Sequence, residues 1–289
     1  MQTLLQIYTQ TINTLKQAHI EEYEQETVII FSELLNLNRL DLKLNENLQL
    51  TQEKINKIEN IVLQRLNRKP LQYILKKAWF YGHEFYIQEG VFIPRPETEI
   101  LVDIVGQLIK KISSPLKIAD IGCGSGCIAL SLAKIFSDIK IYAVDINELA
   151  INTAKINAKN LNIPDEQICF LHGDKFDPLK NKGRFDIIIS NPPYIPSNII
   201  KTLDMEVQSY EPLNALDGGN DGIDFYKDFA NESPNFLNVN GYLCVETGEK
   251  QSDKIQNIFK KNNLKIESII KDLNGINRVI VASFTGHKN

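Results

Sequence analysis

The chain has 289 residues, of which 43% are hydrophobic and 24% are charged, a balance typical of a globular protein with room for one large and one small domain. Its formal net charge of −4 argues against a general electrostatic attraction to nucleic acid. No apolar run approaches the roughly 20 residues that a bilayer span needs, and the start of the chain does not resemble a signal peptide, so we expect a cytoplasmic protein without membrane contact.

The first 77 residues carry apolar side chains at helical spacing. The pattern is clear over residues 4–15, 28–35 and 55–66. Thr51 is the expected N-cap of the third segment, and Pro70 is the expected first residue of a short fourth helix. Because no residues with evident chemistry gather here, we predict a small helical bundle whose apolar stripes form its own core and a docking face.

Two short aromatic runs, residues 79–81 and 84–87, predict a β-hairpin after the bundle. Two prolines then bracket Arg95, and Glu97 and Glu99 fall in the first turn of the next predicted helix. Acidic side chains stabilise a helix N-terminus, so a structural role explains both glutamates. Of these residues, Arg95 is the one that a structural role explains least well. Arg95 is therefore a candidate substrate-binding residue.

Strands and helices alternate from Leu116 onward. Strands are predicted at residues 117–121, 140–144, 168–171 and 184–190, and helices at residues 127–136 and 147–160. This order is typical of a doubly wound α/β sheet with right-handed crossovers. In such sheets, ligands bind beyond the carboxyl ends of the strands.

A glycine-rich loop, Gly122-Cys123-Gly124-Ser125-Gly126, follows the first of these strands. Glycine lets backbone N–H groups and the chain itself approach a ligand closely. Asp145, at the end of the second strand, is placed to bind ribose hydroxyls, and Asp174, near the end of the third, to accept from an adenine amino group. The chain has no lysine in a phosphate-binding pattern, so these residues predict a nucleoside cofactor that lacks phosphates. The loop and Asp145 alone fit NAD and S-adenosylmethionine equally.

The tetrapeptide Asn191-Pro192-Pro193-Tyr194 comes directly after the fourth strand. Two consecutive prolines stiffen the turn and leave carbonyl groups without competing donors. The Asn191 side-chain oxygen and a neighbouring prolyl carbonyl could accept both hydrogens of one planar NH2 group, and Tyr194 adds a flat face. A conjugated NH2 group held in this way presents its nitrogen lone pair to an electrophile. The alternative is a Pro-Pro turn that caps the strand, with a surface tyrosine.

After this tetrapeptide, the acidic stretch 206–222 is expected to close over the substrate, with Asp221-Gly222 capping a helix that begins near Ile223. The cysteines and histidines show no spacing typical of a zinc site or a disulfide framework, so we expect neither a metal nor catalysis by histidine. These residues are Cys123, Cys127, Cys169, Cys244, His19, His83, His172 and His287.

Together these features resemble class I S-adenosylmethionine-dependent methyltransferases that act on an amide or exocyclic amino nitrogen. More narrowly, the chain is similar to the HemK/PrmC family, the peptide chain release factor glutamine N(5)-methyltransferases. The likeness rests on the loop from Asp120 to Gly126, on Asp145 and Asp174, on the tetrapeptide at Asn191, and on four further blocks. These blocks are residues 93–99, 211–222, 246–251 and 272–278.

The resemblance implies a class I methyltransferase fold, a doubly wound seven-stranded sheet whose last strand is antiparallel, with a small N-terminal helical bundle. The terminal segments 266–270 and 279–284 suit the last strand pair. The implied domains are a helical substrate-recognition domain at residues 1–77, a hairpin linker at 78–93 and a catalytic domain at 94–289.

The resemblance also implies the reaction: methylation of the glutamine amide in the Gly-Gly-Gln motif of class I release factors, with S-adenosyl-L-methionine as cofactor. Asn191 and the Pro192 carbonyl would hold the amide NH2, with Pro193, Tyr194 and Arg95 also at the substrate. The cofactor would contact the glycine loop, Asn191 and three further residues, namely Asp145, Asp174 and Lys175. One departure is Lys175, where relatives often have an aromatic residue against the adenine, and Phe176 is a candidate substitute for that contact. We expect a monomer.

Three alternatives remain open at this point. The first is another methylation substrate, either a ribosomal-protein glutamine or a nucleic-acid amino group, although the net acidity disfavours nucleic acid. A local basic group at Arg65, Arg68, Lys69, Lys76 and Lys77 is better interpreted as a solvated helix face. The second is an NAD-dependent oxidoreductase, which would have no use for the tetrapeptide at Asn191. The third is an adaptor that keeps the fold without catalysis.

Overall fold

The computed structural model describes residues 2–112 and 115–286, and the chain divides into two compact units, residues 1–75 and 76–289. Each unit has its own hydrophobic core. The first unit consists of helices α1 (Leu4–Gln17), α2 (Tyr23–Leu35), α3 (Arg39–Leu44), α4 (Gln52–Leu66) and α5 (Leu71–Leu75). In the described residues, no helix is both long enough and apolar enough to span a membrane.

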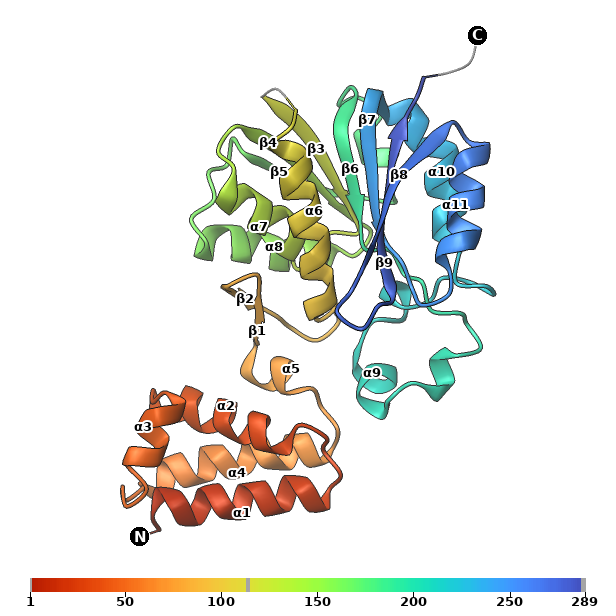
Figure 1. Cartoon of the computed structure of the whole chain (residues 1–289). Coiled ribbons are helices and arrows are strands. Elements are labelled where there is room, and N and C mark those ends of the chain that lie inside the picture. The colour runs from red at the N-terminus through yellow and green to blue at the C-terminus, as the bar shows by residue number, and fades with distance from the viewer. Residues whose placement is uncertain (1, 113–114, 287–289) are drawn as a thin grey trace. The chain divides into compact units, whose positions relative to one another are not determined.

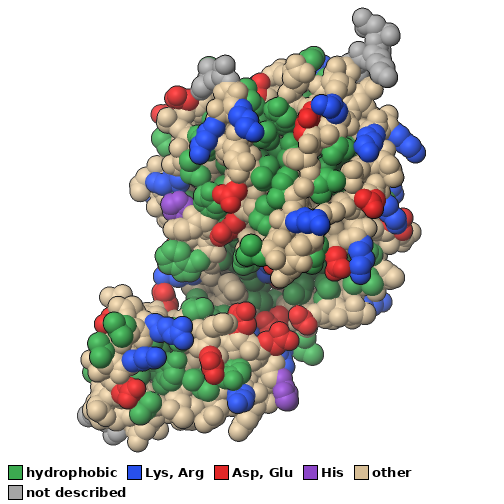
Figure 2. Space-filling model, in the orientation of Figure 1, with side chains coloured by type: hydrophobic (Ala, Val, Ile, Leu, Met, Phe, Trp, Pro, Cys, Tyr) green, Lys and Arg blue, Asp and Glu red, His purple; other side chains and the backbone are tan. Residues whose placement is uncertain are grey.

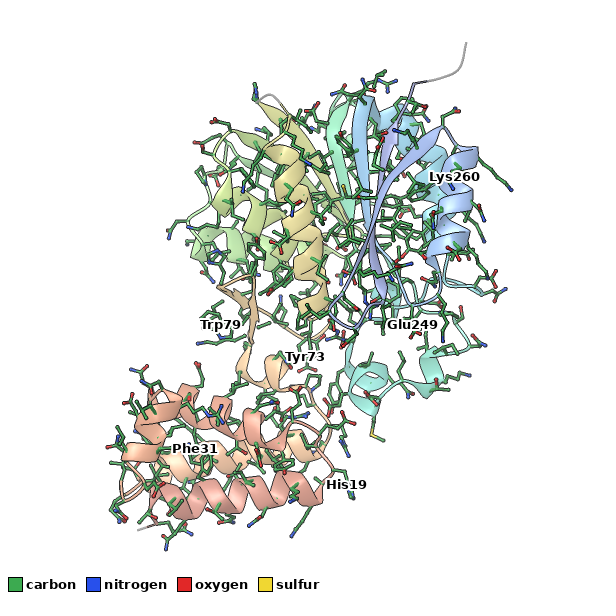
Figure 3. All side chains as sticks on the ribbon, in the orientation of Figure 1. His19, Phe31, Tyr73, Trp79, Glu249 and Lys260 are labelled. Atoms are coloured by element: carbon green, nitrogen blue, oxygen red, sulfur yellow. The ribbon has the colours of Figure 1, made fainter. Side chains whose placement is uncertain are left out.

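Local sequence signals set the helix ends of the first unit. The Thr51 side chain caps α4, as predicted, and a reciprocal capping box of Thr3 and Gln6 starts α1. A second capping box, between Asn38 and Asp41, starts the six-residue helix α3, which the apolar spacing did not predict. The apolar stripes meet around Phe31, which is fully buried (Figure 3).

Arg65 does not lie on a solvated helix face, contrary to the interpretation of the basic group from the sequence. Its side chain is only 1% exposed and pairs with Glu26 at 2.7 Å. The same guanidinium donates to the Lys69 carbonyl at 2.6 Å. Burial of this charge is tolerated because a carboxylate and a carbonyl accept from it, so Arg65 links α4 to α2 inside the bundle and does not form part of a basic surface.

The second unit begins with the predicted hairpin. Strands β1 (Lys77–Phe80) and β2 (His83–Tyr86) pair antiparallel around a turn in which Gly82 has a positive φ of 74°. Trp79, labelled in Figure 3, is 71% exposed on β1. The chain then forms the short 3₁₀ turn η1 (Pro96–Thr98) and helix α6 (Glu99–Ile109).

The remaining elements build one mixed sheet of seven strands, as predicted. The strands are β3 (Leu116–Ile121), β4 (Ile139–Asp145), β5 (Ile168–His172), β6 (Phe185–Ser190), β7 (Leu237–Glu246), β8 (Leu264–Lys271) and β9 (Asn277–Phe284). Their order is β5-β4-β3-β6-β7-β9-β8, and β9 runs antiparallel to both of its neighbours. The helices and short turns between them are α7 (Cys127–Ile135), α8 (Glu148–Asn160), η2 (Asp177–Leu179), η3 (Ile200–Thr202), α9 (Met205–Tyr210), η4 (Leu213–Ala215), α10 (Asp224–Phe236) and α11 (Ser252–Lys261).

Helices cover both faces of this sheet. Helices α6, α7 and α8 lie on one face, and α10 and α11 lie on the other (Figure 1). The central strands β3 and β6 are buried for almost their whole length, which explains their continuous apolar sequences. The face under α10 and α11 is packed with aromatic side chains, among them Phe176, Phe229 and Phe259.

The strand order places the reversal of winding between β3 and β6. The chain leaves β3 toward β4 on one side, and later returns to pair β6 with β3 on the other. At such a switch point the loops after the two strands diverge and leave a crevice at the carboxyl edge. Here those loops are the glycine loop after β3 and the tetrapeptide after β6, so the fold brings together the two motifs that the sequence singled out.

The start of α10 differs from the expectation. Its N-cap is Ile223, which has no side-chain capping hydrogen bond, and the helix begins at Asp224. Asp221 therefore does not cap it. Gly222 instead allows a close approach of two loops, because its φ is 69° and an added Cβ would lie 2.3 Å from the Tyr194 carbonyl oxygen.

Candidate active site

A cavity of about 260 Å³ opens within the second unit, at the carboxyl edge of the sheet. All but one of the predicted site residues line it. The lining members are Arg95, Gly122, Cys123, Gly124, Ser125, Asp145, Asp174, Lys175, Asn191, Pro192, Pro193 and Tyr194. The exception is Gly126, which has a φ of 81° at the start of α7 and lies where a Cβ would meet Leu130 and Ala154 at 3.0 and 3.1 Å. Gly126 thus serves the packing of α7 behind the cavity.

Asp145 fixes the position of the glycine loop. One of its carboxylate oxygens accepts from the Gly124 backbone N–H at 2.8 Å, and the other accepts from the Asn147 N–H at 2.8 Å. Burial raises the pKa of this carboxyl, and the two backbone hydrogen bonds oppose the rise. Each oxygen keeps a further lone pair, so the carboxylate can accept from a diol while it holds the loop.

Asn147 was not predicted as part of the site. It caps α8 through the Leu149 N–H, and its Nδ2 donates to the Gly90 carbonyl at 2.8 Å. It therefore joins the loop after β4 to the segment before η1 at the rim of the cavity. The sequence signal for it was the N-cap position alone, which gives no indication of the second contact.

The Asn191 carboxamide is held from the side of η1. Its Nδ2 donates to the Thr98 hydroxyl oxygen at 3.0 Å. The Tyr194 hydroxyl donates toward Glu246 Oε1 at 3.4 Å, and burial raises the pKa of this phenol well above its ordinary range. Thr98 lines the cavity and Glu246 is buried, and no role was predicted for either residue.

The stretch after the tetrapeptide returns to pair with it. Ile195 donates to the Leu216 carbonyl at 2.9 Å, and Gly218 donates to the Ile195 carbonyl at 2.9 Å. Gln251, from the block 246–251, donates its amide NH2 to the carbonyls of Tyr194 at 2.8 Å and Gly222 at 3.1 Å. Parts of the stretch 203–216 thereby form one wall of the cavity.

Arg95 lies at this wall with its charge paired. Its guanidinium pairs with Glu211, whose side chain is only 2% exposed, and it lies 4.9 Å from the centre of the Phe92 ring. Burial raises the pKa of the Glu211 carboxyl, and the Arg95 charge and hydrogen bond oppose the rise. The ion pair joins the segment before η1 to the wall formed by residues 203–216.

The aromatic surface of the cavity differs from the expectation. Phe176 is fully buried in the core, stacked on Phe236 with ring centres 4.9 Å apart, and does not line the cavity. The prediction that Phe176 replaces the missing aromatic residue is therefore wrong. Phe225 of α10 lines the cavity instead, with the Lys175 ammonium 5.2 Å from its ring centre.

The charged groups around the cavity suit a ligand without phosphates. Lys175 pairs with Asp228 at 2.5 Å, so the two basic side chains that line the cavity in the described part of the chain, Lys175 and Arg95, are already paired. Asp174 at the rim and Asp145 within are acceptors for hydroxyl and amino groups. Asp120, at the end of β3, is fully buried and its pKa is raised to about 7 by burial. On the face shown in Figure 2, basic and acidic side chains are interspersed.

The described histidines do not line the cavity, and His287 lies outside the described residues. His172 on β5 lies 2.9 Å from the Ile146 carbonyl oxygen through its Nε2. Within residues 2–112 and 115–286, no three His, Cys, Asp or Glu side chains are grouped to hold a metal ion. The cysteines are free thiols, and burial raises the pKa of those at positions 123 and 127.

Comparison with known proteins places this arrangement among methyltransferases. Residues 6–75 match the family model of the PrmC N-terminal domain, residues 86–204 that of the Methyltransferase small domain, and residues 155–275 that of the Eco57I restriction-modification methylase. A release factor glutamine methyltransferase of Fusobacterium nucleatum subsp. nucleatum is 40% identical over 279 residues, which is 96% of this chain and 78% of that protein. A release factor glutamine methyltransferase of Geobacter sulfurreducens is 35% identical over 278 residues, which is 96% of this chain and 95% of that protein.

A solved structure supports the same fold. The methyltransferase from Pyrococcus furiosus superposes with a TM-score of 0.53 at 19% identity, covering 79% of this chain and 98% of that chain. At this level of identity the likeness concerns the fold alone. The predicted class I methyltransferase fold is confirmed.

Proposed function

The chain belongs to the family of release factor glutamine methyltransferases, S-adenosylmethionine-dependent enzymes, and from this membership we propose that it methylates the glutamine of the Gly-Gly-Gln motif in class I translation release factors. The observation that carries the proposal is the position of Asn191 at the switch point. Its carboxamide and the Pro192 carbonyl adjoin the glycine loop and Asp145 in one cavity. An amide acceptor pair and a nucleoside site therefore meet in one place.

The residues at the cavity fit the cofactor. Asp145 would accept from the ribose hydroxyls, and Asp174 from the adenine amino group, while Gly122 and Gly124, both with positive φ, bring backbone close to the ligand. Cys123, Ser125 and Lys175 would complete these contacts. When bound, S-adenosylmethionine supplies a methyl group activated by the sulfonium centre.

The tetrapeptide would hold the acceptor amide. The Asn191 Oδ1 and the Pro192 carbonyl accept the two hydrogens of the glutamine NH2, and Pro193 and Tyr194 pack on its plane. An amide nitrogen is a weak nucleophile because its lone pair is delocalised, so two neutral acceptors help by orienting that lone pair. The cavity walls exclude water from the reacting atoms.

The chain needs no strong base before attack. The methylated nitrogen becomes acidic and can lose its proton to water, and histidine is absent from the described cavity lining. The contribution of the protein is therefore positioning and desolvation. The ion pair of Arg95 with Glu211 serves this purpose by anchoring the wall of the substrate pocket.

The first unit would recognise the release factor, and the second would carry out the transfer. The match of residues 6–75 to the PrmC N-terminal domain supports a role for this unit that is specific to the family. A cytoplasmic location, a monomeric state and the absence of direct nucleic-acid binding stay predictions.

Phe225 offers a test of the cofactor site. We expect Phe225→Ala to raise the dissociation constant for S-adenosylmethionine by roughly tenfold, because an aromatic contact of about 1.4 kcal/mol would be lost. Phe225→Leu, which keeps apolar bulk, should recover part of the affinity. Isothermal titration calorimetry of both variants measures the effect, and unchanged affinity in the alanine variant would show that the adenine lies elsewhere.

The proposed function is tested by methyl transfer from labelled S-adenosylmethionine to a purified class I release factor. A release factor whose Gly-Gly-Gln glutamine is replaced by alanine is the matched control, and ribosomal protein and DNA are parallel substrates. We expect label on the intact release factor and none on the control. Label only on ribosomal protein or DNA would support methyl transfer but contradict the proposed substrate. Reduction of NAD would contradict both the proposed reaction and the proposed substrate.

A further inference from the structure

The Gln251 side chain joins three loops of the second unit. Its Nε2 donates to the Tyr194 carbonyl at 2.8 Å and to the Gly222 carbonyl at 3.1 Å, and its Oε1 accepts from the Gly248 N–H at 3.1 Å. These partners belong to the loops after β6, before α10 and after β7. Gln251 is only 8% exposed, so the three hydrogen bonds are shielded from competing water.

The start of helix α11 does not explain this glutamine. Gln251 is the N-cap residue of α11, yet its side chain makes no capping hydrogen bond. A capping side chain accepts from an N–H in the first turn of its helix, whereas Oε1 of Gln251 accepts from Gly248, which precedes the helix. The side chain therefore serves the neighbouring loops and not the helix that begins there.

We propose that Gln251 is a positioning residue that fixes the path of the tetrapeptide Asn191-Pro192-Pro193-Tyr194, and with it the direction of the two acceptors for the substrate amide. The inference rests on the proposed function, because that function assigns the acceptors to Asn191 and Pro192. Gln251 does not line the cavity, so it acts on the substrate through the tetrapeptide.

The tetrapeptide depends on anchors at its ends. Pro192 and Pro193 have no backbone N–H, so neither can donate a hydrogen bond that would hold the turn. At one end the Asn191 side chain donates to Thr98 at 3.0 Å, and at the other the Tyr194 carbonyl accepts from Gln251. The φ angles of the two prolines are fixed by their rings, so anchoring both ends leaves the Pro192 carbonyl little freedom to turn.

The space around Gln251 is as restricted as its hydrogen bonds. An added Cβ at Gly222 would lie 2.3 Å from the Tyr194 carbonyl oxygen and 2.5 Å from Gln251 Nε2. An added Cβ at Gly248 would lie 2.7 Å from Gln251 Oε1 and 3.0 Å from Tyr194 Cδ2. Two glycines thus bring their backbone against the Gln251 carboxamide, and one of them also confines the Tyr194 ring.

The polarity of the contacts requires a carboxamide in one orientation. All three partners are backbone groups, so their donor or acceptor character is constant. A flipped carboxamide would place Oε1 against two carbonyl oxygens and the NH2 group against the Gly248 N–H. A carboxylate at this position would likewise have no donor for the Tyr194 and Gly222 carbonyls.

The first experiment compares Gln251→Glu with Gln251→Met. The glutamate keeps the size of the side chain and removes the donor, whereas the methionine keeps its length and removes all three hydrogen bonds. For both we expect kcat for release factor methylation to fall roughly 10- to 100-fold, because the acceptors are no longer held in line with the substrate amide. The KM for the release factor and the dissociation constant for S-adenosylmethionine should each change by no more than about threefold.

Gln256→Glu is the matched control for the change of charge. Gln256 lies on the same helix, α11, and its carboxamide donates to Asp253 of that helix, so kcat of this variant should equal that of wild type. Calorimetric titration with S-adenosylmethionine gives the number of binding sites per chain. Expressing kcat per binding site removes any contribution from unfolded protein. Wild-type kcat per site in Gln251→Met would refute the positioning role.

The second experiment combines Gln251→Glu with Asn191→Ala. If Gln251 acts through the acceptor pair, its substitution should cost no more than about threefold once Asn191 Oδ1 is gone, because a single carbonyl no longer fixes the rotation of the substrate NH2. A purely structural role would give the same fold-loss in both backgrounds. Full additivity of the two substitutions therefore overturns the proposal.

The outcomes separate this proposal from the proposed function. If wild type transfers no methyl group to a release factor, the proposed function has failed, and the same variants are compared on the amide or amino substrate that wild type does accept. There, a loss of kcat in Gln251→Glu that disappears in the Asn191→Ala background still supports the positioning role. If wild type methylates the release factor and both Gln251 variants do so at the same rate, the proposed function stands and the positioning role is refuted.

Discussion

Replacing Asn191 by alanine is expected to lower kcat for release factor methylation by roughly 100- to 1,000-fold, the cost typical of removing one preorganised hydrogen-bonding group from an active site. The carboxamide is proposed to orient the lone pair of the substrate nitrogen, a contact that gains strength as the nitrogen attacks. The dissociation constant for S-adenosylmethionine should change little, because Asp145 and the glycine loop hold one another without Asn191.

The measurement pairs single-turnover methyl transfer with calorimetric cofactor binding on the same preparation. Asn198→Ala is the matched control, since Asn198 is an exposed asparagine of the same loop region, and its kcat should equal that of wild type. Equal losses of kcat and cofactor affinity in Asn191→Ala would mean that Asn191 supports the cofactor site as a whole. In that case its role in holding the substrate amide is refuted.

The sequence predicted the sheet and the meeting of its two motifs because the relevant signals are local. A buried parallel strand has a continuous apolar run, and the loops after β3 and β6 begin where those runs end. The rule that ligands bind at the switch point then brings the glycine loop to Asn191 without any knowledge of side-chain contacts. Helix α3 was missed because six residues are too few to show a period.

The errors arise where long-range contacts decide the role of a side chain. Phe176 directly follows Lys175, yet Lys175 has a positive φ of 41° and the chain turns Phe176 into the core, while Phe225 comes to the cavity from a distant helix. Thr98 looked like part of a helix start, and its contact with Asn191 depends on the fold of the whole second unit. Neighbourhood in sequence gives no indication of such pairs.

The second large effect is expected at Asp145. Asp145→Ala should raise the dissociation constant for S-adenosylmethionine by roughly 10- to 100-fold, since it removes charge-assisted hydrogen bonds of about 1.5–3 kcal/mol to the ribose. Calorimetric titration measures the change. Part of the loss could come from the glycine loop, because the same carboxylate accepts from Gly124 and Asn147. Affinity of the variant alone therefore does not identify the ribose contact.

A 2′-deoxy analogue of the cofactor separates the two contributions of Asp145. In wild type the analogue should bind more weakly than the cofactor, because one hydroxyl donor is missing. In Asp145→Ala the two should bind with the same affinity, since a contact that the protein has already lost is not lost again when the ligand changes. Asp165→Asn, an exposed aspartate before β5, is the control in which the difference persists. If the cofactor still binds more tightly than the analogue in Asp145→Ala as well, the ribose hydroxyls donate to another acceptor. Asp145 would then serve only to hold the glycine loop.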